Sequence, residues 1–157
     1  MNGFDQQKAA RVWQRVQQAQ PQGKQPGRLE ELPELMMNEW SAAAAYRQLA
    51  RQYQGKGGEQ YQRLARQEQK HGACLQGIYV LINGEKCPVQ NPPPAQEPPE
   101  RSLRRCYGIH LRAMKAYESR ADDPEYGAVF GELARQEREH CMAVLELMGN
   151  LGKKERQ

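Results

Sequence analysis

The sequence predicts an all-α protein built as a four-helix bundle. Helix-forming residues, above all Gln, Ala, Glu, Arg and Leu, recur along the chain. No stretch alternates Val, Ile or Thr with polar residues, as a half-buried strand would. The segment LARQEQKH at residues 64–71 returns as LARQEREH at 133–140, which indicates a duplicated helical hairpin. At 157 residues, a single domain is the expected organisation.

Residues 1–28 are expected to form a short amphipathic helix followed by a tether. Ala9, Val12, Trp13 and Val16 share one face of a helix predicted over residues 5–18, which Asp5 can cap. Residues 19–28 contain two prolines and two glycines, which end that helix. The helix can pack on its own bundle or on a second subunit, and the sequence favours neither.

The bundle is predicted over residues 29–150, and its first hairpin over 29–87. One helix should run from about residue 33, where Pro33 suits a first turn, to about residue 54. Its partner should run from about residue 59 to Gly84, a helix stop. These limits leave Glu39 and Glu68 about 9 Å apart along the helix axes. The first helix should therefore end nearer residue 51, or the second should begin earlier.

A proline-rich crossover is predicted over residues 88–99, followed by a second hairpin over 100–150. The crossover holds six prolines and extends about 37 Å at about 3.1 Å per residue. A helix of about 22 residues is about 33 Å long, so the crossover can span the bundle. A third helix is expected at about 100–121, and a fourth from Pro124, capped by Asp123, to Gly149.

Each predicted helix carries an apolar stripe at three- and four-residue spacing that is interrupted by ionisable residues. A buried, unpaired carboxylate costs several kcal/mol, so three of them converging with histidines indicate bound cations. All three histidines of the chain fall on these stripes. The stripes are Leu35, Met36, Glu39, Ala42, Ala43, Tyr46, Ala50 and Tyr53; Tyr61, Leu64, Ala65, Glu68, His71, Leu75, Ile78 and Ile82; Leu103, Tyr107, His110, Leu111, Met114 and Tyr117; and Val129, Phe130, Leu133, Glu137, His140, Val144 and Leu147.

A Glu-x-x-His motif occurs in both copies of the repeat, at Glu68/His71 and Glu137/His140. Three-residue spacing places both side chains of a motif on one helix face, one turn apart. Carboxylate and imidazole together suit divalent iron or manganese. The two motifs therefore predict a metal site between the hairpins.

With these motifs, residues 33–149 resemble the ferritin-like superfamily, specifically the di-iron domain of rubrerythrins. The family has an acid seven residues before a tyrosine on the first helix, matched by Glu39 and Tyr46, then Glu-x-x-His on the second. The third and fourth helices repeat this pattern. However, His110 lies seven residues before Tyr117, where the family usually has glutamate.

The resemblance implies a site for two iron ions, with manganese or mixed metals as alternatives. Glu68 and Glu137 would bridge the ions; Glu39 and His71 would complete one, and His140 with His110 the other. Tyr46 and Tyr117 would hydrogen-bond to ligands or fill core space. Two divalent ions carry four positive charges and the three carboxylates offset three, so hydroxide or an exogenous anion would supply the rest. Glu118, about 12 Å further along its helix than His110, is expected at the surface.

The resemblance also implies a rubrerythrin-like oxidoreductase that acts on peroxide or dioxygen. The alternatives are a non-catalytic metal-binding, storage or structural protein, and a bundle that has lost its metals. Cys74, Cys87, Cys106 and Cys141 show no Cys-x-x-Cys spacing, which excludes a rubredoxin-type iron site and predicts free thiols that line the site or fill the core. A redox-active protein would then need a separate electron-donor protein. We further expect a homo-oligomer, namely a dimer.

Charge and hydropathy argue against two classes of partner. The net charge of +4 comes from basic residues interleaved with acids, whereas nucleic-acid binding needs them clustered. No apolar run approaches the length of a membrane span, and no secretory signal precedes the domain. A cytoplasmic protein with neither a nucleic-acid nor a membrane partner is expected.

Overall fold

The computed structural model describes residues 29–154 and, before them, Gln7, Arg11 and Gln14. This part of the chain contains no strand and four α-helices: α2 (Leu32–Gln52), α3 (Gly55–Asn83), α4 (Pro99–Glu118) and α5 (Gly127–Lys154). The predicted all-α four-helix bundle is confirmed. The helix expected at residues 5–18 and the tether at 19–28 lie outside the described residues, apart from those three positions.

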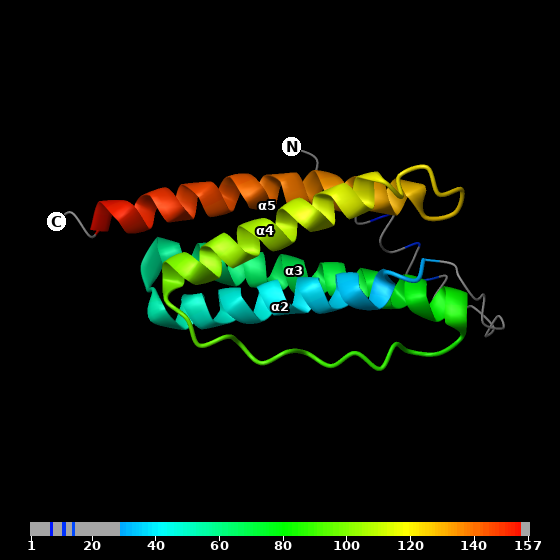
Figure 1. Ribbon diagram of the computed structural model, residues 1–157, viewed down its shortest axis with the longest axis horizontal. Coiled ribbons are helices and arrows are strands. Elements are labelled where there is room, and N and C mark those ends of the chain that lie inside the picture. Colours follow the sequence, from blue (N-terminus) through cyan, green and yellow to red (C-terminus); the bar gives the residue numbers. More distant parts are fainter. Residues whose placement is uncertain (1–6, 8–10, 12–13, 15–28, 155–157) are drawn as a thin grey trace.

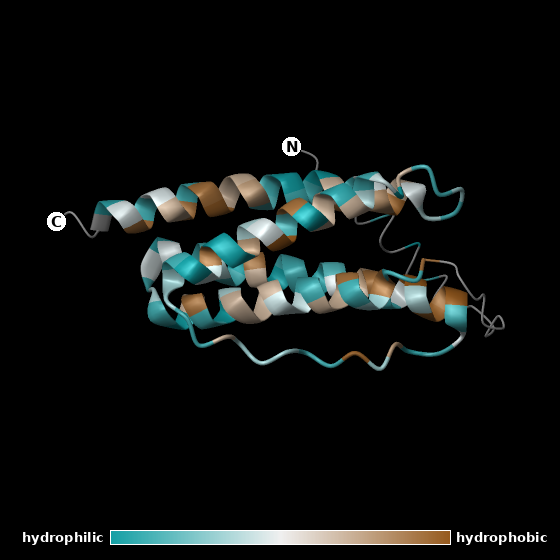
Figure 2. Ribbon diagram, in the orientation of Figure 1, coloured by the Kyte–Doolittle hydropathy of each residue, from teal (hydrophilic) through white to brown (hydrophobic). Residues whose placement is uncertain are grey.

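The helices form two pairs that pack against each other. Figure 1 shows α2 beside α3 and α4 beside α5, and each pair is joined by a short turn. Contacts between α2 and α4 and between α3 and α5 close the bundle. In Figure 2, hydrophobic and hydrophilic residues alternate along every helix, as expected when each helix buries one face. Among the described helices, none combines the length and apolar character that a membrane span requires.

The turn between α2 and α3 sets two carboxylates at the same height. Helix α3 begins at Gly55, earlier than predicted, because the glycines form its first turn rather than a loop. Gly55 has a left-handed φ of 68°, and a Cβ at Gly58 would lie 2.2 Å from the Tyr53 carbonyl oxygen. Glu39 consequently lies 13 residues before the end of α2, and Glu68 lies 13 residues after the start of α3.

The proline-rich segment runs along the outside of the bundle, as predicted (Figure 1). Helix α3 ends where Gly84 adopts a left-handed φ of 75°. The Gln76 side chain then anchors the segment by accepting from the Cys87 N–H at 3.0 Å and donating to its carbonyl at 3.1 Å. At the other end, Glu97 accepts from Ser102 and Arg105 on α4.

The second hairpin differs from its predicted limits. Asp123 Oδ1 accepts from the N–H groups of Glu125 and Tyr126, in the turn that precedes α5, and α5 begins at Gly127 rather than at Pro124. The predicted stop at Gly149 was wrong. Helix α5 continues to Lys154 because Leu151, one turn after Leu147, is also buried.

The core consists of two apolar clusters on either side of a polar layer. One cluster gathers around Trp40, Ile78 and Phe130, and the other around Leu49, Leu64 and Val144. The predicted stripes of α3 and α5 are buried apart from half-buried Val129. On α2, Ala50 and Tyr53 are only half-buried. The α4 stripe was wrong at Tyr107, Leu111 and Met114, which are half-buried, whereas the core positions are Cys106, Ile109 and Ala113.

Candidate metal centre

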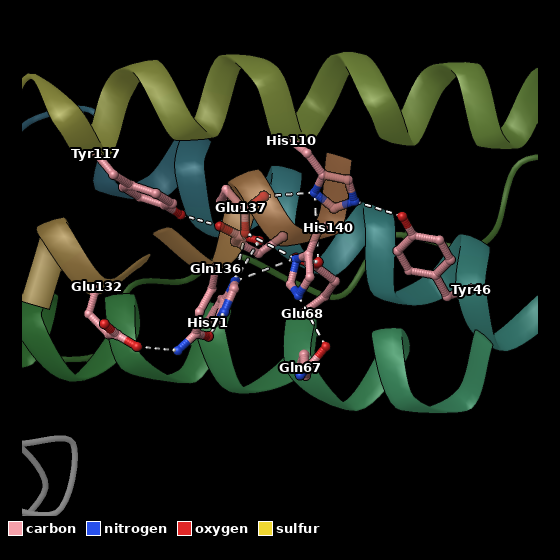
Figure 3. Close-up of polar contacts among 11 residues, drawn as sticks. Tyr46, Gln67, Glu68, His71, His110, Tyr117, Glu132, Gln136, Glu137 and His140 are labelled. Atoms are coloured by element: carbon pink, nitrogen blue, oxygen red, sulfur yellow. Dashed lines mark hydrogen bonds and ion pairs between the residues drawn. The ribbon is translucent and has the colours of Figure 1, made fainter. Parts of the chain in front are cut away.

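Six ionisable side chains meet in the polar layer between the two apolar clusters. All six are the residues predicted from the sequence, and none is more than 3% exposed. We call them the Glu/His cluster, and Figure 3 shows how most of them converge. The members are Glu39 from α2, Glu68 and His71 from α3, His110 from α4, and Glu137 and His140 from α5.

The Glu/His cluster divides into two groups of four residues that share two members. In each group, one ligand atom per residue lies within 4.8 Å of the others. Glu68 and Glu137 belong to both groups. The unshared members are Glu39 and His71 in one group, and His110 and His140 in the other. This buried cluster of carboxylates and imidazoles can bind metal ions.

Every histidine directs the same ring nitrogen, Nδ1, at the carboxylates. The Nδ1 atoms of His71 and His110 each lie 2.7 Å from an oxygen of Glu137. The Nδ1 atom of His140 lies 2.5 Å from Glu68 Oε1. The contacts from His71 to Glu39 and Glu68 are longer, at 3.6 and 3.7 Å.

Several buried atoms of the cluster have no hydrogen-bond partner among the described residues, and all of them are potential ligand atoms. They are Glu39 Oε2, both carboxylate oxygens of Glu68, and His140 Nδ1. The short distance between His140 Nδ1 and Glu68 lacks the angles of a hydrogen bond, so neither atom is satisfied by the other. Buried polar atoms without partners are costly. A divalent cation would satisfy them together, so these residues fit a metal site.

Burial and the neighbouring charges shift the pKa values of the cluster residues in different directions. Burial, reinforced by the charges of Glu137 and Glu39, raises the pKa of Glu68 well above its usual range. Burial also opposes ionisation of Glu137, yet hydrogen bonds from His110 and His71, together with the nearby His140, hold its pKa well below its usual range. Burial opposes charge on His71, but its hydrogen bond to Glu137 and the nearby charges of Glu39 and Glu68 raise its pKa above 6.5. Protons therefore neutralise part of the cluster when no metal does.

The two predicted tyrosines each cross from one hairpin to the other. Tyr117 on α4 donates its hydroxyl hydrogen to Glu39 on α2. The Tyr46 hydroxyl on α2 lies 2.6 Å from His110 Nε2 on α4 (Figure 3). Burial is the main reason why the pKa of both hydroxyls is raised well above 10. Both tyrosines thus contact cluster residues and fill core space at once.

Two glutamines that the sequence analysis did not predict contact the cluster. Gln136 Oε1 accepts from His71 Nε2 at 2.7 Å, and Gln67 Oε1 accepts from His140 Nε2 at 3.1 Å. Glutamine is common on the exposed faces of this chain, so residue type alone gives no signal. Their position does give one, because each directly precedes the glutamate of the repeated motif.

The remaining candidates lie outside the cluster. Glu118 is exposed and pairs with Arg138 at 3.0 Å, as expected for a surface acid. All four cysteines are free and buried, and neither four-residue group includes one. Burial raises the pKa of the Cys74 and Cys106 thiols to about 12, so both stay protonated near neutral pH.

Comparison with known proteins identifies no relative. No protein-family model, curated protein or solved structure matches this chain. Its function must therefore be inferred from the chemistry of the Glu/His cluster.

Proposed function

We propose that this chain is a ferritin-like protein of the rubrerythrin type whose Glu/His cluster holds two iron ions. The observation that carries this proposal is the pair of four-residue groups with two shared carboxylates. Glu39 and His71 would hold the first ion, His110 and His140 would hold the second, and Glu68 and Glu137 would contact both. Manganese or a mixed pair would suit the same oxygen and nitrogen donors.

The proposed activity is reduction of peroxide or dioxygen. Two reduced metal ions held by the cluster would supply two electrons, which with two protons would convert hydrogen peroxide to two waters. The ligands are at most 3% exposed, which favours a substrate of very few atoms. Tyr46 and Tyr117 keep their hydroxyl protons at neutral pH, since burial raises the pKa of both. They therefore hold protons next to His110 and Glu39.

The charge of the cluster supports binding of an anion beside the metals. With neutral histidines, three carboxylates leave one of the four positive charges of two divalent ions unbalanced. Hydroxide or an anionic substrate would complete the balance. The electrons would come from a separate donor protein, because each turnover consumes two. The dimer stays a prediction.

A non-catalytic role in metal storage or assembly is the second candidate. The observation that favours it is His110, a neutral ligand where the resembling family has an acid. Fewer negative charges stabilise the lower oxidation state of the metal, which weakens its tendency to give electrons to peroxide. The two candidates share the metal site and differ in what peroxide does to it.

Anaerobic titration of the metal-free protein with ferrous iron, followed by peroxide, tests the proposal. We expect two iron ions per chain, both oxidised by one equivalent of peroxide, with metal-free protein as the control for reaction at cysteine. Two bound ions that stay ferrous would support the non-catalytic role instead. Fewer than about 0.2 equivalents of iron, with no rise in melting temperature, would contradict both roles, since a ligand of the folded state must stabilise it.

A further inference from the structure

Each Glu-x-x-His motif is held by a glutamine of the opposite hairpin. His71 on α3 contacts Gln136 on α5, and His140 on α5 contacts Gln67 on α3. The glutamines occupy equivalent positions in the two repeats, so the contacts are reciprocal. Figure 3 shows both amides on the side of the imidazole rings that faces away from the carboxylates.

These contacts determine which nitrogen of each histidine faces the cluster with a lone pair. An amide oxygen only accepts hydrogen bonds, so Nε2 of His71 and of His140 carries the hydrogen. A neutral imidazole has a single N–H, which leaves the lone pair on Nδ1. The Nδ1 atom of His71 lies 2.7 Å from Glu137, and that of His140 lies 2.5 Å from Glu68. Two electron-rich atoms repel each other at such distances unless a proton or a metal cation lies between them.

The amide of Gln136 is itself oriented by an acid. Its Nε2 donates to Glu132 Oε1 at 3.1 Å, and Arg135 donates to the same oxygen at 2.6 Å. Because a carboxylate only accepts, the amide oxygen of Gln136 must face His71. In the other repeat, Arg63 occupies the position equivalent to Glu132. The environment of Gln67 therefore lacks this acid.

His110 provides the contrast within the cluster. Its Nε2 faces the Tyr46 hydroxyl at 2.6 Å, and a hydroxyl can donate or accept. The contact at Nε2 therefore does not by itself choose the tautomer of His110, whereas the amide oxygens beside Nε2 of His71 and His140 require a hydrogen there.

We propose that Gln67 and Gln136 are positioning residues that fix His140 and His71 as Nδ1 ligands, so that each hairpin prepares the metal site of the other. The inference rests on the proposed two-metal function. It predicts crossed effects. Gln67→Leu should weaken binding of the ion held by His110 and His140, and Gln136→Leu should weaken binding of the ion held by Glu39 and His71. The expected loss of affinity is about 10- to 100-fold, as for other hydrogen-bond partners of ligating histidines.

Double-mutant cycles with anaerobic ferrous iron titration test the crossing. In a His140→Ala background, Gln67→Leu should have no further effect on iron affinity, because its partner is gone. In a His71→Ala background, Gln67→Leu should keep its full effect. Gln136→Leu should show the reverse. Gln69→Leu is the matched control, since Gln69 lies on the same helix and accepts from Arg47 at the surface.

A conservative variant and a readout without metal separate positioning from packing. Gln67→Glu keeps an acceptor and should bind iron as the wild type does, whereas Gln136→Glu would repel Glu132 and should not. Nitrogen NMR of the metal-free protein should show a hydrogen on Nε2 of both His71 and His140. In Gln67→Leu, only the His140 signals should change.

The possible failures are distinguishable. A wild-type protein that binds no iron overturns the proposed function. If the wild type binds two ions but Gln67→Leu and Gln136→Leu weaken both ions equally, or neither, only the positioning role is overturned. If Gln67→Leu does not fold, the Gln67→Glu titration and the hydrogen positions in the wild type still decide, and an Nε2 without hydrogen on His71 or His140 would overturn the positioning role.

Discussion

The two hairpins present the same ligand pattern to the centre and differ at one position. Helices α3 and α5 each contribute Glu-x-x-His, and the two motifs occupy equivalent places in the Glu/His cluster. Helices α2 and α4 contribute Glu39 and His110, each seven residues before a tyrosine. The fold is thus nearly two-fold symmetric, while the charge of the cluster is not.

The tyrosines explain how the fold accommodates this difference. Tyr117 donates to the Glu39 carboxylate, which only accepts, whereas Tyr46 contacts an imidazole nitrogen of His110. Because a hydroxyl can both donate and accept, either partner can be satisfied. An imidazole at position 110, where the other hairpin has the Glu39 carboxylate, thus keeps a hydrogen bond to a tyrosine but adds no negative charge to the cluster.

The largest loss of metal binding is expected from substitution of Glu68 or Glu137, the two carboxylates that both four-residue groups share. Glu68→Ala or Glu137→Ala should remove most metal from both proposed sites, because each carboxylate belongs to both four-residue groups. The loss of affinity should exceed the roughly 100-fold that the loss of an outer hydrogen-bond partner causes. Metal analysis of protein purified without chelator measures it. Glu118→Ala, an exposed acid paired with Arg138, is the control, and equal metal loss in all three variants would contradict the ligand assignment.

A change in thermal stability should be the next largest effect, when His110→Glu gives both hairpins the same ligand pattern. His110→Glu adds a fourth buried carboxylate, which costs several kcal/mol without metal. Each kcal/mol lowers the melting temperature by about 2–4 °C in a domain of this size. Ferrous iron should reverse this loss, since four carboxylates balance two divalent ions. His110→Gln is the neutral control. An equal decrease in melting temperature with and without iron would count against a metal beside His110.

A smaller effect should appear in the pH dependence of stability. The folded-state pKa values of Glu68 and His71 are raised above 4.5 and 6.5, so the metal-free folded protein binds more protons than the unfolded chain. Its stability should therefore fall as pH rises from about 6 to about 8, while the lowered pKa of Glu137 contributes a constant amount there. Metal ligands must lose their protons, so metal binding should add stability as pH rises. Denaturant unfolding at several pH values would show this, and identical slopes with and without metal would refute it.

The sequence predicts the cluster because polar residues on the inward stripes of the helices must lie in the bundle core. A helix that buries Leu64 and Ile78 must also bury Glu68 and His71 between them. Their spacing along the helix therefore determines their burial. Which histidine nitrogen faces the carboxylates does not follow from spacing, because it depends on Gln67 and Gln136 from the opposite hairpin.

Helix limits and rotations were harder to predict. The apolar spacing predicts a stripe of α4 through the bulky Tyr107, Leu111 and Met114, whereas its buried face carries the smaller Cys106 and Ala113. The sequence predicts that residues 55–58 lie between two helices and that Gly149 ends the last helix. Tertiary packing overrides the low helix propensity of glycine at both places, since Gly58 in α3 and Leu151 in α5 are buried.

Anomalous diffraction from metal-loaded crystals, measured at the iron and manganese absorption edges, would show directly where metal ions bind in this protein. Two peaks are predicted inside the Glu/His cluster, one beside Glu39 and His71 and one beside His110 and His140, with Glu68 and Glu137 contacting both. The edge that gives the signal identifies the metal. A single peak, or peaks only outside the cluster, would contradict the two-metal assignment.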